Sequence, residues 1–332
     1  MRLRFSIAVI VAGWCLASPA AAEKRLALIV GNSAYASASR LANPANDAGD
    51  MAAALKQIGF EVLVGADLDK RAFDAKVREF ARALPAADVA LFYYAGHGLQ
   101  VGGRNYLVPT DAQLQTERDL DFEGVALDFV LKQMELEREG KTNIVLLDAC
   151  RDNPLARNLA RTMGTRSGNV GQGLAQVQTG VGTFIAYATQ PGNVALDGQG
   201  RNSPFTGALT KALAVPDRSI TTVMIEVRKD VLATTGGRQV PWDHSALTGD
   251  FIFHQSRLQN SSCAANFSSW KGKSRGVRVR FGQGVSATNH FANRDGTCLC
   301  AERYQTPGTT FKAFFFRCCA SRPARSPMRT SN

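Results

Sequence analysis

Short runs of apolar residues alternate along this chain with longer segments in which apolar residues recur every three or four positions. The runs predict buried strands of a parallel sheet, and the longer period predicts amphipathic helices. The expected strands cover residues 25–30, 60–64, 89–95, 142–148, 183–188 and 251–253. The expected helices cover residues 43–59, 71–84, 127–139, 204–214 and 221–235. This order predicts an α/β domain whose mostly parallel central sheet carries helices on both faces.

Two stretches depart from this alternation. Gly102 and Gly103, followed by residues 105–109, predict a small hairpin beyond the third strand. Residues 151–182 contain six glycines, scattered arginines and few apolar residues, and they predict a mobile surface loop. A loop of this length inside a domain is unusual and is often functional.

The first residues have the pattern of an export signal. Arg2 and Arg4 precede an apolar run, Phe5–Ala17, and Ser18–Ala22 supplies small residues for cleavage after Ala22. The run is short for a membrane span, and an uncleaved membrane anchor is the alternative. We expect an exported protein, periplasmic or secreted, with a signal peptide over residues 1–22.

The net charge of +11 comes entirely from one end of the chain. Residues 255–332 contain 13 Lys/Arg and 2 Asp/Glu, whereas residues 1–254 contain 26 of each sign. A neutral main domain gives no reason to expect nucleic acid as a partner.

Two of the expected strands each run into a reactive side chain. His97 follows the third strand between two glycines, and Cys150 follows the fourth. Ligands bind at the carboxyl ends of parallel strands, so neighbouring strands would bring a thiol and an imidazole together, as a cysteine nucleophile with a general base requires. Cys150 is also the only cysteine between Cys15 and Cys263. The alternatives are a small buried apolar residue for the cysteine and a turn residue for the histidine.

Several segments in the same order resemble the caspase and metacaspase clan of cysteine peptidases. Two of these segments are Tyr94–Gly98, which contains His97, and Asp148–Arg151, which contains Cys150. The histidine and the cysteine are 53 residues apart, a spacing typical of caspases. Further segments similar to bacterial members of the clan are residues 25–32, 41–47, 202–205 and 247–251. The resemblance covers about residues 24–254. It implies a three-layer caspase-like fold and hydrolysis of peptide bonds.

The resemblance also implies a role for each site residue. Cys150 would be the nucleophile that forms a thioester, and His97 would be the acid/base that protonates the leaving amine. The backbone N–H groups of Gly98 and Cys150 would hold the tetrahedral oxyanion. No cofactor is implied. Calcium activates some metacaspases, but no calcium-binding loop is recognisable in this sequence.

The residue two positions before the cysteine indicates a specificity. The caspase signature has glutamine there, whereas this chain has Asp148, as metacaspases do, and in metacaspases that aspartate lines the pocket for the residue preceding the cut. A carboxylate in this pocket favours Arg or Lys and repels Asp. Asp197 is similar to the second acidic wall of the pocket, with a turn aspartate before Gly198 as the alternative. We expect cleavage of protein or peptide substrates after basic residues.

Family members are often cut between the two halves of the domain. Arg157, Arg161 and Arg166 lie in the expected loop over residues 151–182. A peptidase specific for basic residues would cut itself there. Solvated surface arginines are the alternative.

The last part of the chain has no long periodic pattern. Residues 255–332 contain five cysteines and His290, but the spacings Cys298-x-Cys300 and Cys318-Cys319 do not match common zinc sites. We expect no metal site and a weakly structured basic tail after a peptidase domain over residues 23–254. A sequence that has drifted out of its reading frame would look similar.

Two other functions fit part of these observations. A caspase-like binding module without activity would usually lack the thiol or the imidazole, and both are present here. A cysteine hydrolase of other amides or esters would have no use for the pocket aspartates. The sequence therefore favours a cysteine endopeptidase.

Overall fold

The computed structural model describes residues 23–149, 154–163, 170–171 and 173–256, and the tail segments 289–292, 298–302 and 315–318. The chain divides into two units, Met1–Ser256 and Arg257–Asn332. Across the residues so described, no helix is long and apolar enough to cross a membrane.

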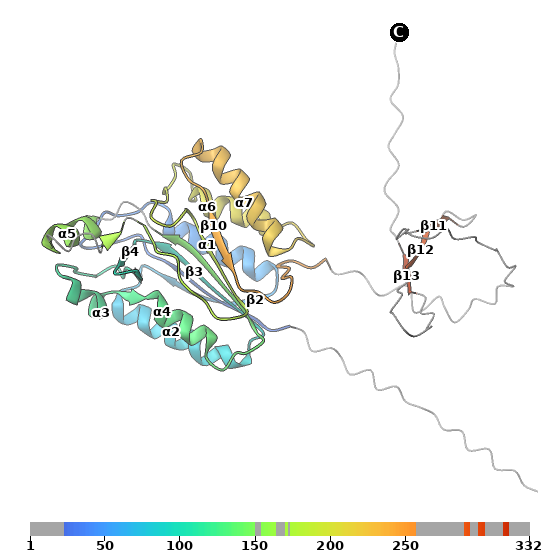
Figure 1. The fold of residues 1–332 in the computed structure, drawn as a ribbon, viewed down its shortest axis with the longest axis horizontal. Coiled ribbons are helices and arrows are strands. Elements are labelled where there is room, and N and C mark those ends of the chain that lie inside the picture. The colour runs from blue at the N-terminus through green and yellow to red at the C-terminus, as the bar shows by residue number, and fades with distance from the viewer. Residues whose placement is uncertain are drawn as a thin grey trace, which may run out of the picture. The chain divides into compact units, whose positions relative to one another are not determined.

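A six-stranded sheet forms the centre of the first unit (Figure 1). The order across the sheet is β10-β9-β7-β3-β1-β2, and the edge strand β10 runs antiparallel to β9 while the other pairs are parallel. The strands are β1 (Arg25–Gly31), β2 (Phe60–Ala66), β3 (Val89–Gly96), β7 (Thr142–Ala149), β9 (Thr183–Tyr187) and β10 (Trp242–Ser245). The mostly parallel sheet predicted from the sequence is confirmed.

Helices cover both faces of this sheet (Figure 1). One face carries α1 (Pro44–Gln57), α6 (Pro204–Leu213) and α7 (Ile220–Thr235), and the other carries α2 (Lys70–Ala83) and α4 (Leu127–Glu135). Successive residues of a strand point to opposite faces. Tyr93 of β3 accordingly packs in the first layer and Tyr94 in the second. All eight residues of β3 are buried as a result, which gives the predicted three-layer α/β architecture.

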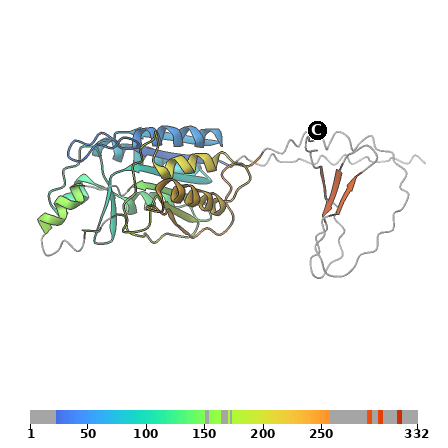
Figure 2. The same ribbon diagram turned by 90° about the horizontal axis from the view of Figure 1, so that it is seen from above.

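A second, antiparallel sheet lies beyond the carboxyl ends of the central strands (Figure 2). Its order is β6-β5-β4-β8, and β4 and β5 form the hairpin that Gly102 and Gly103 predict. The strands are β4 (Gly98–Val101), β5 (Arg104–Leu107), β6 (Val125–Ala126) and β8 (Val170–Gly171). The short helices η2 (Glu117–Asp119) and α3 (Leu120–Glu123) lie between β5 and β6, and η1 (Leu84–Ala86) comes directly before β3.

The prediction of a surface loop throughout residues 151–182 is wrong for part of this stretch. Residues 154–163 form helix α5 (Pro154–Met163), and Val170 and Gly171 form β8. Leu155 and Leu159 are buried in a cluster that includes Leu99 of β4. The six glycines of residues 151–182 all follow this helix, and within it the two buried leucines, four residues apart, are a weak helical signal in an otherwise polar segment.

The expected closing strand over residues 251–253 is also a wrong prediction. Ile252 makes only an isolated bridge to Ser219, and the antiparallel edge of the sheet is β10 instead. Phe251 and Phe253 are buried in the layer of α6 and α7. Their apolar side chains therefore serve the packing of this layer and do not mark a strand. The actual edge strand, β10, is Trp-Asp-His-Ser and has little strand propensity of its own.

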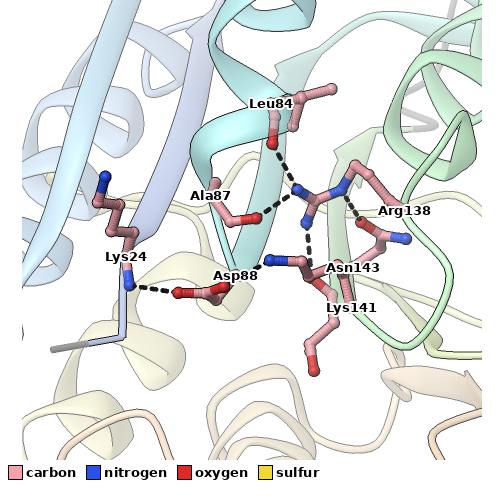
Figure 3. A network of polar contacts seen from close by, with 8 residues as sticks. Lys24, Leu84, Ala87, Asp88, Arg138, Lys141 and Asn143 are labelled. Atoms are coloured by element: carbon pink, nitrogen blue, oxygen red, sulfur yellow. Dashed lines mark hydrogen bonds and ion pairs between the residues drawn. The ribbon is translucent and has the colours of Figure 1, made fainter. Parts of the chain in front are cut away.

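A buried arginine lies at the amino ends of β3 and β7 (Figure 3). Arg138 is 4% exposed, and it donates hydrogen bonds to the carbonyl oxygens of Leu84 at 2.6 Å and Ala87 at 2.7 Å. A third hydrogen bond goes to Asn143 Oδ1 at 3.2 Å. Burial lowers the pKa of the Arg138 guanidinium, and the nearby Asp88 raises it.

Asp88 is the acidic partner at this edge. It accepts hydrogen bonds from Lys141 Nζ at 2.5 Å and from the backbone N–H of Lys24 at 3.0 Å. These contacts lower the pKa of its carboxyl. The starts of β1, β3 and β7 are thereby tied together by charged groups.

The second unit contains a three-stranded antiparallel sheet that the prediction of a weakly structured tail missed. The order is β11-β12-β13, from β11 (Asn289–Ala292), β12 (Cys298–Glu302) and β13 (Phe315–Cys318).

Candidate active site

The carboxyl ends of β3 and β7 meet at the middle of the central sheet. The two strands are parallel neighbours, and Gly96 pairs with Ala149 at the end of their register. His97 and Cys150 are the next residues in the sequence after this pair. Cys150 lies outside the described residues, so its role stays a prediction.

The backbone of His97 is held from three sides. Its N–H donates to Tyr35 Oη at 2.7 Å. Its carbonyl oxygen accepts from Tyr94 Oη at 2.7 Å and from the N–H of Val108 at 3.0 Å. Tyr35 also packs its ring against the imidazole, with 4.5 Å between the ring centroids. His97 is completely buried, and these contacts fix where its ring can lie.

The tautomer of His97 follows from its ring contact. Nε2 lies 2.8 Å from the carbonyl oxygen of Ser39. A carbonyl oxygen only accepts hydrogen bonds, so Nε2 carries the proton and, in the neutral ring, Nδ1 carries the lone pair. Nδ1 is then the nitrogen that can take up a proton during a reaction.

Glycines flank His97 because the space on both sides is small. Gly96 has φ +152°, and a Cβ there would lie 2.5 Å from Tyr35 Oη. A Cβ on Gly98 would lie 3.2 Å from the Cβ of Ala149. The backbone of Gly98, a predicted oxyanion donor, therefore runs close to the residue that precedes Cys150.

Asp148 is completely buried at the end of β7. Its Oδ2 accepts hydrogen bonds from Ser203 Oγ and, at 2.8 Å, from Thr206 Oγ1. Ser203 is the N-cap of α6 and also accepts from the N–H of Thr206 at 2.9 Å. Thr206 Oγ1 in turn lies 2.6 Å from Tyr93 Oη. The first turn of α6 thus positions the carboxylate, and both donors are neutral hydroxyls.

Asp197 contacts a different segment. Its Oδ2 accepts from the N–H of Ala42 at 2.8 Å, and its carbonyl oxygen accepts from Asn43 Nδ2 at 2.5 Å. Ala42 and Asn43 end the loop over residues 32–43 that also contains Ser39. The structure therefore brings Asp197 to the loop that contacts His97, a relation the sequence did not predict.

The arginines suggested for self-cleavage have separate outcomes. Arg157 and Arg161 are exposed on α5, and Arg161 Nη2 donates to Asn158 Oδ1 at 2.7 Å. Arg166 lies outside the described residues.

Sequence reasoning missed the residues that orient His97. Tyr35 carried no signal, because a tyrosine in an irregular segment has no periodic context. Ser39 acts through its backbone carbonyl, a group that every residue type has. Ser203 and Thr206 lie in or next to the segment 202–205, which was noted only for its resemblance.

Among the described residues, no group of three or more acidic, histidine or cysteine side chains could hold a metal ion.

Several known proteins resemble this chain in sequence or in fold. The model of the caspase domain family, Peptidase C14, matches residues 24–252. The human mucosa-associated lymphoid tissue lymphoma translocation protein 1 is 33% identical over 132 residues, which are 39% of this chain and 15% of that protein. Its mouse homologue matches to the same extent. The chain thus spans only a small part of these relatives.

Among solved structures, the crystal structure of caspase-1 from Spodoptera frugiperda has a TM-score of 0.51 and 18% sequence identity. The match covers 71% of this chain and 92% of that one, and at this identity it shows the fold alone. The family match, in contrast, covers more than half of the chain. The chain therefore belongs to the caspase domain family of cysteine peptidases.

Proposed function

We propose that the domain is a cysteine endopeptidase with Cys150 as nucleophile and His97 as acid/base. The observation that carries this proposal is the contact of His97 Nε2 with the Ser39 carbonyl at 2.8 Å. Nδ1 is therefore the basic nitrogen of the ring. His97 comes directly after Gly96, which pairs with Ala149 of the neighbouring strand. A buried histidine with one nitrogen committed to a carbonyl is suited to proton transfer through the other.

The proposed reaction proceeds in two stages. His97 Nδ1 takes the thiol proton of Cys150, the sulfur attacks the scissile carbonyl carbon, and the same proton passes to the leaving amine as the C–N bond breaks. Water then hydrolyses the thioester, which releases the acid and restores the thiol. Backbone N–H groups of Gly98 and Cys150 hold the oxyanion. The close approach of Gly98 to Ala149 supports this pairing of donors.

For specificity, we propose cleavage after Arg or Lys, with Asp148 as the acidic wall. The two hydroxyls that donate to its Oδ2 hold this carboxylate at the carboxyl end of β7, two residues before Cys150 in the sequence. A basic side chain of the substrate would gain a charged partner there, whereas an acidic one would be repelled.

Matched fluorogenic peptides that differ only in a terminal Arg, Lys or Asp test the proposal. We expect turnover of the Arg and Lys peptides, lost in Cys150→Ala and in His97→Ala. Faster turnover of the Asp peptide would reject the specificity. No turnover of any peptide, after attempts at activation, would favour a binding module.

We also propose that the enzyme acts outside the cytoplasm on protein or peptide substrates with basic residues. The support is the pattern of residues 1–22, which lie outside the described residues. N-terminal sequencing of the mature protein tests it: a first residue of Glu23 is expected, and an intact Met1 on the exported form would contradict cleavage.

A further inference from the structure

Asp197 is bonded to the loop whose backbone contacts His97. Its carboxylate accepts a hydrogen bond from the N–H of Ala42 at 2.8 Å. Three positions earlier in the same loop, the Ser39 carbonyl accepts a hydrogen bond from Nε2 of His97 at 2.8 Å. The acidic side chain and the histidine are therefore linked through one short piece of backbone.

This piece of backbone needs an anchor. Residues 36, 37, 39, 40 and 42 are exposed, so little packing fixes the Ser39 carbonyl. Before Ser39, the N–H of Ala36 bonds to the Thr110 carbonyl at 2.8 Å, and after it the N–H of Leu41 bonds to the Ser33 carbonyl at 3.1 Å. Asp197 supplies a side-chain acceptor on this second side, for the N–H of the exposed Ala42.

Asp197 is itself on a fixed support. The N–H of the preceding Leu196 donates to Oε1 of the fully buried Gln239 at 2.9 Å. The Asp197 carbonyl accepts from Asn43 Nδ2, and Asn43 is 2% exposed. Backbone held on both sides of the side chain keeps the carboxylate directed at Ala42.

We propose that Asp197 is a positioning residue for His97, which acts by holding the loop that carries the Ser39 carbonyl. The proposal rests on the catalytic role proposed for His97, and it replaces the interpretation of Asp197 as an acidic pocket wall. In this role Asp197 acts as a hydrogen-bond acceptor through Oδ2, and its negative charge matters less for holding the loop.

Two substitutions separate these roles, because asparagine keeps an acceptor oxygen and loses the charge. If Asp197 positions the loop, Asp197→Asn keeps kcat/KM for the Arg peptide within about threefold of wild type, whereas Asp197→Ala lowers kcat about tenfold or more with little change in KM. If Asp197 is instead a pocket wall, both variants raise KM for the Arg peptide to a similar extent. That second result would overturn the proposal.

A readout independent of turnover keeps this test separate from the proposed peptidase activity. In protein with 15N-labelled histidine, the ring nitrogen shifts of His97 report which nitrogen carries the proton, and His97→Gln assigns the signal. We expect the Nε2–H form in wild type and Asp197→Asn, and a mixture with the Nδ1–H form in Asp197→Ala. An unchanged His97 signal in folded Asp197→Ala would overturn the positioning role even if no peptide is cleaved.

Arg201 provides the matched control. It ties the same segment to α1 by binding Asp50, with Nε–Oδ2 and Nη2–Oδ1 distances of 2.9 Å. Arg201 takes no part in the hydrogen bond between Asp197 and Ala42. Arg201→Ala is expected to change neither the His97 signal nor kcat. A His97 change in this control equal to that in Asp197→Ala would show that general loosening of the segment is responsible, and would overturn a specific role for Asp197.

Discussion

The two ends of β3 and β7 bury charges of opposite sign. At the amino ends, the Arg138 guanidinium donates to carbonyl and amide oxygens and lies near the acidic Asp88 (Figure 3). At the carboxyl ends, the carboxylate of Asp148 is held by the hydroxyls of Ser203 and Thr206. The first end holds a cation whose hydrogen bonds go to neutral oxygens, and these bonds tie the segments before β3 and β7 together. The second end holds an anion, which the first turn of α6 positions through two hydroxyl groups.

The comparison predicts that the amino end matters for stability. Arg138→Ala removes a donor from the buried carbonyls of Leu84 and Ala87, of which the Leu84 carbonyl keeps the N–H of Ala87. We expect a loss of about 2–4 kcal/mol in the free energy of unfolding, since an unsatisfied buried acceptor alone costs about 1–3 kcal/mol. Urea denaturation measures this loss, and kcat/KM of the folded fraction should not change. Lys141→Ala, which removes a half-exposed partner of Asp88, should have a much smaller effect. Similar losses in both variants would contradict the assignment.

The carboxyl end should matter for activity instead. Asp148→Asn keeps an acceptor for Ser203 and Thr206 but removes the charge. We expect kcat/KM for Arg and Lys peptides to fall by roughly 100-fold with a small change in stability, since loss of a buried charged partner usually weakens binding by about 2–5 kcal/mol. Peptide kinetics and urea denaturation on the same preparation check both halves. A stability loss without a change in specificity would make Asp148 an anchor of α6 only.

Two glycines with positive φ sharpen the comparison. Gly96, at the carboxyl end, has no room for a Cβ, which would meet Tyr35 Oη at 2.5 Å, whereas Gly140, ahead of β7, has φ +73° and open space around it. We expect Gly96→Ala to lower the free energy of unfolding by about 2–3 kcal/mol through overpacking, and to reduce activity through Tyr35. Gly140→Ala should lose only about 1–2 kcal/mol to backbone strain. Equal losses by urea denaturation would show that crowding around Gly96 relaxes freely.

The sequence predicted the fold well because the buried strands and amphipathic helices are locally encoded. β1, β3 and β7 were identifiable as apolar runs, and His97 was noticeable between two glycines. The prediction failed where tertiary contacts override the local pattern. β10 is polar and becomes a strand only by pairing with β9, and the Ser39 carbonyl reaches His97 across 58 residues of sequence.

The smallest expected effect concerns the contact between Arg201 and Asp50. The guanidinium lowers the pKa of the Asp50 carboxyl in the folded protein. The contact therefore stabilises the fold fully above the usual carboxyl pKa of about 4, and this contribution disappears as the pH falls through the lowered folded value. Thermal unfolding of wild type and Arg201→Ala should differ slightly at pH 7 and converge at the lowest pH. A difference that grows on acidification would contradict this sign.

Helix α5 begins four residues after Cys150 and carries Arg157 and Arg161. A peptide bond in a hydrogen-bonded helix must leave the helix before a peptidase can bind it in an extended form. If the protein cuts itself at either arginine, the rate is set by the fraction of molecules in which α5 is open, when opening and closing are fast compared with cutting. The packing of the buried Leu155 and Leu159 side chains then sets the rate of self-cleavage, because every loss of this packing shortens the lifetime of the uncut chain.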